Sequence, residues 1–391
     1  MKVLQVHNEY RHRGGEDVVV DRERDDLQAA GHHVVRYSVS NDAGALETVK
    51  GLVFAPWNPW EARRLSSVID AEAPDVVHVH NTWFHLSPAV IVEVSKLGIP
   101  LVHTLHNYRW VCSNAQLLRD GHPCRECVVN GRSSAVKYRC YRSSFTLSVV
   151  AAVTGVAAER RGVWLNDIDR FITMTRRAKE MFIEWGFPQD RFVVHPHRLP
   201  DPGPREERPS LSDEILYVGR LDDDKGVEQM CAAWATGRSR HRLVVIGDGP
   251  MASDLQIRFP EVSFPGRLTN DEVIDRMRNA RALLFPAVSE ETFGLVVIEA
   301  MASGLPTASS SIALISDFVR ETGSDWVFDV SSEDEWSRIF ELIEDDIAVD
   351  AAGQRARAIF ETDFIADGSA SLVAVYQEAI NHRQRRGLAG A

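Results

Sequence analysis

Short apolar runs that alternate with segments of helical periodicity constrain the fold of this chain more than any other feature. Strands that alternate with helices in this way are typical of βαβ units and parallel sheets. We therefore predict an α/β protein built from doubly wound sheets. The runs predicted as strands are Val3–His7, Val34–Val39, Val76–His80, Leu101–Leu105, Phe171–Met174 and Phe192–His195, followed by Ile215–Val218, Leu243–Ile246, Val262–Phe264 and Ala282–Phe285.

The chain is too long for a single core. Its 391 residues predict two domains, each of about 180 residues. The segment from Pro196 to Pro209 is rich in proline and polar residues, which indicates a hinge. In doubly wound sheets ligands bind at the carboxyl ends of the strands, so we expect the two Rossmann-like domains to face each other across a ligand cleft. The predicted parts are a first domain at 1–197 with a cysteine-rich insertion at 107–145, a hinge at 198–212, a second domain at 213–365, and a C-terminal helix at 366–391 that could pack back on the first domain.

One helix is well delimited by its sequence. Thr175 is a good N-cap residue, Arg176–Trp185 forms the body, Gly186 suits the C′ position, and Pro188 stops the helix. The sequence therefore predicts a helix that begins just after the strand candidate Phe171–Met174.

Composition and charge exclude several classes of protein. A hydrophobic content of 44% with 26% charged residues is typical of globular proteins. The net charge of −12 divides into +3 for residues 1–200 and −15 for the rest, and so acidic a second half argues against nucleic acid as a partner. No run free of Asp, Glu, Lys and Arg exceeds 17 residues, and the N-terminus lacks a signal-peptide core. We therefore expect a cytoplasmic protein.

The loop at residues 216–226, L-Y-V-G-R-L-D-D-D-K-G, places two cations after a predicted strand. Gly219 ends the strand, Arg220 follows at once, and Lys225 comes five residues later. An Arg acts as a fork and a Lys as a point charge toward phosphate oxygens, so the pair could hold a diphosphate. A second strand leads into the Gly-rich turn V-I-G-D-G-P at 245–250, which taken alone is only a turn.

The stretch S-E-E-T-F-G-L-V-V-I-E-A-M at 289–301 places acids around an apolar helix start. Gly294 allows close approach of the backbone, and the helix that begins there presents N–H groups to an anion. Glu299 then lies in the second turn, where its carboxylate could accept hydrogen bonds from the hydroxyls of a ribose. Glu291 could do the same for a sugar ring. The alternative is that Glu299 pairs with a buried arginine.

These motifs come in one order and at one spacing: G-R-x4-K, G-D-G-P, V-x-F-x-G at Val262–Gly266, and E-x-F-G-x4-E-A-M-A-x-G-x-P. In this the chain resembles glycosyltransferase family 4, retaining enzymes of the GT-B fold, over nearly its whole length. The resemblance implies that the second domain binds a nucleotide-diphosphate sugar, with UDP or GDP as the nucleotide, and that no catalytic metal is needed. The donor-binding residues it implies are Gly14, Gly15, Gly219, Arg220, Lys225, Gly266, Glu291, Phe293, Gly294, Leu295, Val296 and Glu299.

The first half carries two further points of resemblance. The motif R-G-G-E-D resembles the glycine loop of the family, in which Gly14 and Gly15 would close over the phosphates. H-T-L-H ends in His106, which resembles the histidine that contacts the donor sugar, although a lone histidine is more often structural. With His106, the resemblance gives Glu291, Arg220 and Lys225 as the catalytic set. It implies attack of the acceptor hydroxyl from the face that the diphosphate leaves, with retention of configuration.

Four of the five cysteines cluster within 29 residues. Cys112, Cys124, Cys127 and Cys140 have the spacing C-x11-C-x2-C-x12-C, which can close a tetrahedral structural zinc site. Unmetallated buried thiols and a redox role are the alternatives. The segment also resembles a branch of family 4 found among enzymes that build polysaccharides.

The acceptor and any membrane contact are less constrained. Residues 131–180 hold ten basic and four acidic residues, which suits an anionic membrane or acceptor, or is simply a solvated face. The apolar run Phe145–Ala157 could lie on a membrane or be a buried helix. We expect transfer to a glycan, a lipid-linked or a small-molecule acceptor in cell-surface polysaccharide or glycoconjugate synthesis. A nucleotide-sugar epimerase, a phosphorylase and a non-catalytic nucleotide-sugar-binding partner of the same fold are the alternatives.

Overall fold

The computed structural model describes residues 1–11, 14–42, 44–237 and 239–389. The chain divides into two compact units, which are described separately here. Unit 1 comprises Met1–Leu117, Arg125–His195 and Asp367–Ala391, and unit 2 comprises Leu118–Cys124 and Pro196–Ala366.

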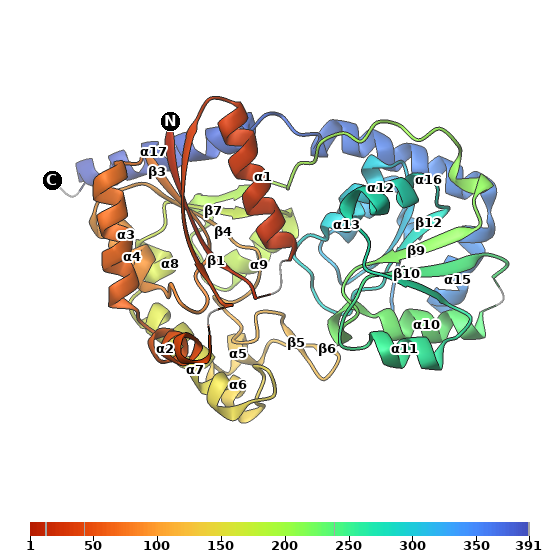
Figure 1. The fold of residues 1–391 in the computed structure, drawn as a ribbon, viewed down its shortest axis with the longest axis horizontal. Coiled ribbons are helices and arrows are strands. Elements are labelled where there is room, and N and C mark those ends of the chain that lie inside the picture. The colour runs from red at the N-terminus through yellow and green to blue at the C-terminus, as the bar shows by residue number, and fades with distance from the viewer. Residues whose placement is uncertain (12–13, 43, 238, 390–391) are drawn as a thin grey trace. The chain divides into compact units, whose positions relative to one another are not determined.

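Unit 1 contains a parallel sheet of six strands in the order β2-β1-β3-β4-β7-β8 (Figure 1). Because crossovers between parallel strands are right-handed, the helix from β1 to β2 and the helix from β3 to β4 lie on opposite faces of the sheet. The order reverses between β1 and β3, so the carboxyl ends of these two strands border an open crevice. The strands are β1 Lys2–Glu9, β2 His33–Ser40, β3 Val76–Asn81, β4 Leu101–Thr104, β7 Arg170–Thr173 and β8 Phe192–Val194.

Ten helices belong to unit 1 in the described part of the chain. The predicted helix after Phe171–Met174 is confirmed as α9, with the Thr175 hydroxyl accepting a hydrogen bond from the Ala178 N–H and Gly186 in the left-handed region. The helices are α1 Gly15–Ala29, α2 Ala45–Phe54, α3 Pro59–Glu72, α4 Ala89–Lys96, α5 Glu126–Val129, α6 Ser133–Lys137, α7 Phe145–Arg160, α8 Val163–Asn166, α9 Arg176–Glu184 and α17 Ala370–Ala389, with a 3-10 turn η1 at Gln189–Arg191.

The last helix, α17, completes the core of unit 1. Its apolar residues pack with Leu27 of α1 against the alternate residues of β1, β3, β4 and β7 that share one face of the sheet. Polar contacts fix it further, because the buried carboxylate of Asp169 accepts hydrogen bonds from His382 and Arg383 at 2.9 Å each. The residues that α17 contributes to this core are Leu372, Val375, Tyr376 and Ala379.

Unit 2 has a second parallel sheet of six strands in the order β11-β10-β9-β12-β13-β14. Its strands are β9 Glu214–Val218, β10 Arg242–Ile246, β11 Ser263–Gly266, β12 Ala282–Phe285, β13 Thr307–Ser310 and β14 Val327–Phe328, and a small hairpin is formed by β5 Leu118–Arg119 and β6 His122–Pro123. Its helices are α10 Val227–Thr236, α11 Ala252–Arg258, α12 Asn270–Arg278, α13 Leu295–Ala302, α14 Ser316–Thr322, α15 Glu333–Glu344 and α16 Asp346–Ile359, with short turns η2 Pro209–Leu211, η3 Asp223–Lys225, η4 Ser324–Trp326 and η5 Phe360–Phe364.

The predicted α/β class with parallel sheets is confirmed, and all ten predicted strands are present. The prediction missed β13 and β14 of the second sheet and the two short hairpin strands β5 and β6. The strand β13 reads T-A-S-S and is fully buried, while β14 has only two residues, so neither shows the apolar run by which strands were recognised. In the described part of the chain, no helix is long and apolar enough to cross a membrane.

Candidate functional site

The sheet of unit 2 has a switch point between β9 and β12. These strands are neighbours, with Ile215 opposite Ala282, while the chain leaves β9 toward one edge of the sheet and β12 toward the other. Such a point leaves a crevice at the carboxyl ends of the two strands, where ligands bind. The loop with Arg220 and Lys225 follows β9, and the loop with Glu291 and Gly294 follows β12. The fold therefore brings the two predicted loops to one place.

Lys225 and Glu291 are in direct contact. The Lys225 ammonium lies 2.9 Å from the Glu291 carboxylate and 3.5 Å from that of Asp224. Burial by itself lowers the pKa of Lys225, but the two carboxylates outweigh burial and raise that pKa above its usual value. The predicted diphosphate cation and the predicted sugar-binding acid therefore form an ion pair in the protein without ligand.

Arg220 does not join this pair. Its side chain is 60% exposed, and its Nε donates to the Asp222 carboxylate at 3.0 Å. Its backbone oxygen accepts a hydrogen bond from the Tyr217 hydroxyl at 2.8 Å, which fixes the loop while leaving the guanidinium in solvent. Arg220 is thus available to an anionic ligand at the cost of one exposed ion pair, a contact worth about 0–1 kcal/mol.

The start of α13 depends on Gly294. This residue has a φ of 80°, and a Cβ placed on it would lie 2.9 Å from the Cζ atom of Phe285. The Val297 N–H bonds to the Gly294 carbonyl, so the N–H groups of Leu295 and Val296 lie in the first turn, where no intrahelical carbonyl accepts from them. As predicted, these amides point out from the N-terminus of a helix.

Two other predicted donor residues on this loop and helix have different environments. Glu299 is the fifth residue of α13 and is half-buried. Phe293 is 3% exposed, and its ring packs edge to face with His197 at 5.1 Å and near Phe364. The Phe293 side chain therefore belongs to the core of unit 2, so only its backbone is left to meet a ligand.

The glycines of unit 2 join three loops through backbone hydrogen bonds. The Gly219 N–H donates to the Ile246 carbonyl at 3.0 Å, and the Gly247 N–H donates to the Gly266 carbonyl at 2.9 Å. The Leu221 N–H reaches the Asp248 carbonyl at 3.0 Å. The loops after β9, β10 and β11 are therefore held together at the carboxyl edge of the sheet.

In unit 1, Gly14 and Gly15 lie at the start of α1, directly after β1. The Gly14 N–H donates to Asp17 at 2.8 Å, and His7 lies at 2.8 Å from the other oxygen of the same carboxylate. Burial opposes the charge of Asp17, but these hydrogen bonds lower the pKa of its carboxyl. The first residue of the R-G-G-E-D motif, Arg13, lies outside the described residues.

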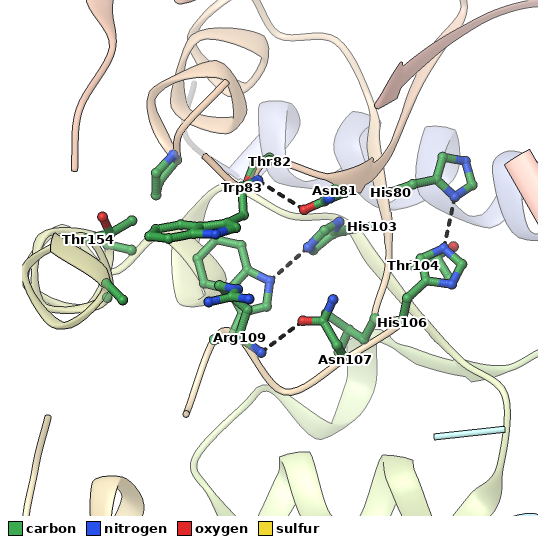
Figure 2. Close-up of a pocket in the computed structure, with 16 residues that line it drawn as sticks. His80, Asn81, Thr82, Trp83, His103, Thr104, His106, Asn107, Arg109 and Thr154 are labelled. Carbon is green, nitrogen blue, oxygen red and sulfur yellow. Dashed lines mark hydrogen bonds between the residues drawn. The ribbon is translucent and has the colours of Figure 1, made fainter. Parts of the chain in front are cut away.

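His106 lines a pocket of unit 1 that is open to solvent. Figure 2 shows His80 and His106 at one end of the group of residues drawn and Trp83 and Arg109 toward the other, near Thr154 of α7. His106 follows β4, and its Nε2 lies 3.1 Å from the Nδ1 of His80. The predicted histidine is therefore on a cavity wall, with a second histidine behind it that the sequence analysis did not single out.

A buried acid continues this line of side chains. The Nε2 of His80 lies 3.5 Å from the Oε2 of Glu23, and neither atom has a hydrogen-bond partner in the described part of the chain. Burial raises the pKa of Glu23 to about 8 and lowers that of His80 well below its ordinary value. The sequence signal for this arrangement is H-V-H in β3, since residues two apart on a strand share a face.

Glu23, His78 and His80 are also the only three acidic, histidine or cysteine side chains in the described chain whose ligand atoms all lie within 4.8 Å of one another. His78 is a core histidine, however, because its two nitrogens lie 2.9 Å from the Tyr376 hydroxyl and 2.8 Å from the Thr104 hydroxyl. Both nitrogens are therefore used within the fold, and we assign no metal to this group.

The four clustered cysteines form no disulfide within the described residues. Cys112 and Cys127 share a hydrogen bond, which lowers the pKa of Cys112 to about 6. No three of the four sulfurs lie within 4.8 Å of one another in the described chain. The insertion also has a small core without a metal, because Tyr108, Trp110 and Leu117 are each less than 9% exposed.

Two family models match consecutive parts of the chain. Residues 13–197 match the model described as "Glycosyltransferase Family 4", and residues 212–345 match the model described as "Glycosyl transferases group 1". A GDP-mannose-dependent alpha-mannosyltransferase of Corynebacterium glutamicum is 37% identical over 123 residues, which cover 31% of this chain and 29% of that protein. The chain spans between 29% and 54% of the length of the first curated relatives that it matches.

Solved structures share the fold over the whole chain. Sucrose-phosphate synthase of Thermosynechococcus elongatus superposes with a TM-score of 0.68 at 17% identity, and HepE of Anabaena in complex with UDP and glucose with a TM-score of 0.64 at 14% identity. Both alignments cover 100% of each chain. With the two parallel sheets, these likenesses confirm the predicted GT-B fold. The two family models and this fold together support placing the chain among glycosyltransferases of the family 4 type.

Proposed function

We propose that this protein is a retaining glycosyltransferase that moves a sugar from a UDP- or GDP-sugar to a hydroxyl group of an acceptor. The observation that carries the proposal is the meeting of Lys225, Glu291 and the start of α13 at the switch point of unit 2. This region lies within the part of the chain that matches the group 1 model, residues 212–345. The UDP bound in the HepE structure agrees with a nucleotide sugar as the donor.

The donor diphosphate would replace Glu291 as the partner of Lys225. Its oxygens would also meet Arg220 and the first N–H groups of α13, which stabilise the charge that develops as the diphosphate leaves. Glu291 would then be released to accept hydrogen bonds from the transferred sugar, and Glu299 would accept them from the ribose. The absence of a side chain at Gly14, Gly15, Gly219 and Gly266 would allow close approach to the donor.

The acceptor hydroxyl would attack from the face that the diphosphate leaves, and a phosphate oxygen would take its proton. His106 would contact the donor sugar at the reaction centre. This scheme uses no catalytic metal. Product analysis by proton NMR tests it, because the anomeric coupling of the product must match that of the donor. Donor sugar recovered with an inverted ring carbon and no transfer would indicate an epimerase instead.

Donor binding can be tested with the purified chain and a panel of UDP- and GDP-sugars in a thermal-shift assay. A ligand at about 100 times its Kd adds about 2.7 kcal/mol to the free energy of unfolding. Glu299→Ala should then raise the donor KM about tenfold or more, since hydrogen bonds to a charged group contribute about 1.5–3 kcal/mol. Glu341→Ala, an exposed acid in α15, is the control and should leave KM unchanged. An unchanged KM in Glu299→Ala would contradict the ribose assignment.

We also propose a structural zinc ion held by Cys112, Cys124, Cys127 and Cys140. The support is the contact between the Cys112 and Cys127 thiols and the tetrahedral coordination by four thiolates that structural zinc favours. Metal analysis of the purified protein should give one zinc per chain, and Cys127→Ser should lose it, whereas Cys231→Ser should keep it. If the protein contains no zinc and Cys127→Ser leaves its melting temperature unchanged, the small core of the insertion is sufficient to hold the insertion folded.

The acceptor we propose is a glycan or lipid-linked sugar used to build a cell-surface polysaccharide, reached by peripheral contact with the inner face of the membrane. The support is α7, on which Phe145 is 57% and Val153 is 47% exposed, with Arg160 and Arg161 at its end. An apolar strip beside basic residues is typical of helices that lie on anionic bilayers. Sedimentation with anionic vesicles tests the contact, and Phe145→Ser with Val153→Ser should weaken it.

A further inference from the structure

Arg109 presents an unneutralised charge in the pocket of unit 1. Its guanidinium lies over the ring of Trp83 at 4.6 Å and near that of Tyr141 at 5.2 Å. One of its five N–H groups donates to the Ser113 carbonyl at 2.8 Å. It has no ion pair and no further hydrogen bond from the guanidinium within the described residues. The rings and the carbonyl therefore fix the plane of the guanidinium and leave its other donors for a ligand.

No acid on the pocket wall balances this charge. The sixteen residues that line the pocket in the described chain include one permanent cation, Arg109, and no carboxylate. An acid that interacts with Arg109 from outside the pocket wall is Glu16, whose carboxyl group accepts a hydrogen bond from the Tyr10 hydroxyl at 2.9 Å. Burial raises the pKa of Glu16 to about 8 even though the charge of Arg109 opposes that change, so Glu16 is mostly neutral at pH 7. A partly desolvated guanidinium without a counter-charge favours an anion.

A second arginine lies behind the same wall. Arg132 is 6% exposed and its Nη1 has no hydrogen-bond partner in the described chain, while its Nη2 donates to the Trp110 carbonyl. Its one ion pair, with Glu159 at 3.7 Å, is long, and the Glu159 side chain is 60% exposed. Any side chain at Gly155 of α7, which lines the pocket, would overlap the Arg132 guanidinium. The pocket therefore has one arginine on its wall and a second behind it, and the second also lies near the Cys112 and Cys127 thiols.

Two nearly buried indole rings form part of the wall at the same end of the pocket. Trp83 and Trp110 line it and are 5% and 8% exposed, and the Trp110 Nε1 donates to His103 at 2.7 Å. Burial lowers the pKa of His103 to about 4, so this histidine adds no charge.

We propose that this pocket receives an acceptor whose sugar or polyol ring carries a phosphate or carboxylate group, and that Arg109 binds this anion. The ring would lie between Arg109 and His106, with the hydroxyl to be glycosylated toward His106. The inference rests on the proposed function, because it names the acceptor class of the same enzyme. Arg109 belongs to the cysteine-containing insertion, three residues before Cys112.

The test measures binding of the anion without any donor. Inorganic phosphate, glucose 6-phosphate, glucuronate and neutral glucose are titrated into the full-length protein at constant ionic strength, with tryptophan fluorescence and calorimetry as readouts. The wild-type protein should bind the three anions in preference to glucose. Arg109→Gln should weaken anion binding about 10- to 100-fold, as expected for loss of charged hydrogen bonds. The affinity of Arg109→Lys for the anions should lie between those of the wild type and Arg109→Gln, because lysine keeps the charge but lacks the paired donors of the guanidinium.

Arg161→Gln is the matched control. Arg161 also stacks on an indole, that of Trp57 at 4.1 Å, and donates to a backbone carbonyl, that of Ala157, but it does not line the pocket. This variant should bind inorganic phosphate as the wild type does, and it serves as a control for the soluble anions only, because Arg161 also belongs to the proposed membrane contact of α7. A further arm uses phosphatidylcholine vesicles with and without phosphatidylinositol. Sedimentation that requires phosphatidylinositol and Arg109 identifies a lipid headgroup as the source of the anion, and binding of the soluble esters alone identifies a free sugar phosphate.

Three results would overturn the inference. These are equal affinity of the wild type for glucose and its phosphate, unchanged anion binding in Arg109→Gln, and no saturable binding of any anion by the wild type up to about 20 mM. If Arg109→Gln does not fold, the wild-type preference and Arg109→Lys decide the question. The thermal shift with UDP- and GDP-sugars is measured on the same proteins. If UDP- or GDP-sugars raise the melting temperature but no anion binds, only the acceptor class is refuted. If no donor raises the melting temperature of the wild type, the proposed function is refuted.

Discussion

Replacement of Gly294 by alanine should destabilise unit 2 for two separable reasons. The φ of 80° places an alanine in the left-handed region, which costs about 1–2 kcal/mol. The new Cβ would also lie 2.9 Å from the Phe285 ring and 3.5 Å from Ile315, and overpacking of this kind costs about 1–3 kcal/mol more. Phe285 ends β12 and is 6% exposed, so its ring has little room to move away.

Gly203→Ala separates the two terms. Gly203 has a φ of 83°, and a Cβ there would have nothing within 4 Å, so this variant carries the backbone strain alone. Urea unfolding followed by circular dichroism should give a free-energy loss for Gly294→Ala that exceeds the loss for Gly203→Ala by about 1–3 kcal/mol at equal slope. The steric reasoning fails if the two variants agree within about 0.5 kcal/mol. Gly294→Ala should also bind the donor less well, because the first N–H groups of α13 shift with the chain.

Three further outcomes follow from buried polar groups. Glu23 holds its proton up to about pH 8 when folded but only to about its ordinary pKa of 4.5 when unfolded, so its contribution is present at low pH and is lost as the pH rises through this range. The stability of Glu23→Gln relative to the wild type should therefore increase between about pH 5 and pH 8. A difference in urea midpoint between the two proteins that is the same at both pH values would contradict this. Thr175→Ala removes the N-cap bond of α9 and should cost about 1 kcal/mol in chemical denaturation, while Thr175→Ser should retain most of it. Arg281→Leu should cost about 3–5 kcal/mol by calorimetry, because Arg281 is 1% exposed and donates to three backbone carbonyls and an aspartate. Arg276→Leu, at a site that is 33% exposed, should cost less than about 1 kcal/mol. Equal losses for Arg281→Leu and Arg276→Leu would refute the argument that burial sets the cost.

The fold class could be read from the sequence because it depends on local periodicity. Buried parallel strands such as Leu243–Ile246 are continuous apolar runs, and each one is separated from the next by a helix. Capping residues also act locally, which is why the start of α9 at Arg176 was predicted to the residue. The strand β13 was not predicted, because its serines and threonine become buried only through neighbours in the sheet that are distant in sequence.

The candidate donor site could be predicted in outline and not in its contacts. The motifs gave Lys225, Glu291 and Gly294 as functional residues, and the order of strands in unit 2 explains why their loops meet. The ion pair between Lys225 and Glu291 could not be predicted, since the two residues are 66 positions apart. Phe293 was predicted as a donor residue from the same motif, but its side chain packs in the core against His197.

The sequence by itself determined the alternating strands and helices, the helix ends, and the residue types that suit phosphate and sugar chemistry. Each of these depends on neighbours within a few positions, where backbone dihedrals and side-chain periodicity decide the outcome. Only the tertiary structure decided that Glu23, His80 and His106 form a line into a pocket, and that no carboxylate among the described residues shares the pocket wall with Arg109. The physical reason is that burial and Coulomb interactions depend on distance in space, and the order of strands in the sheet sets that distance.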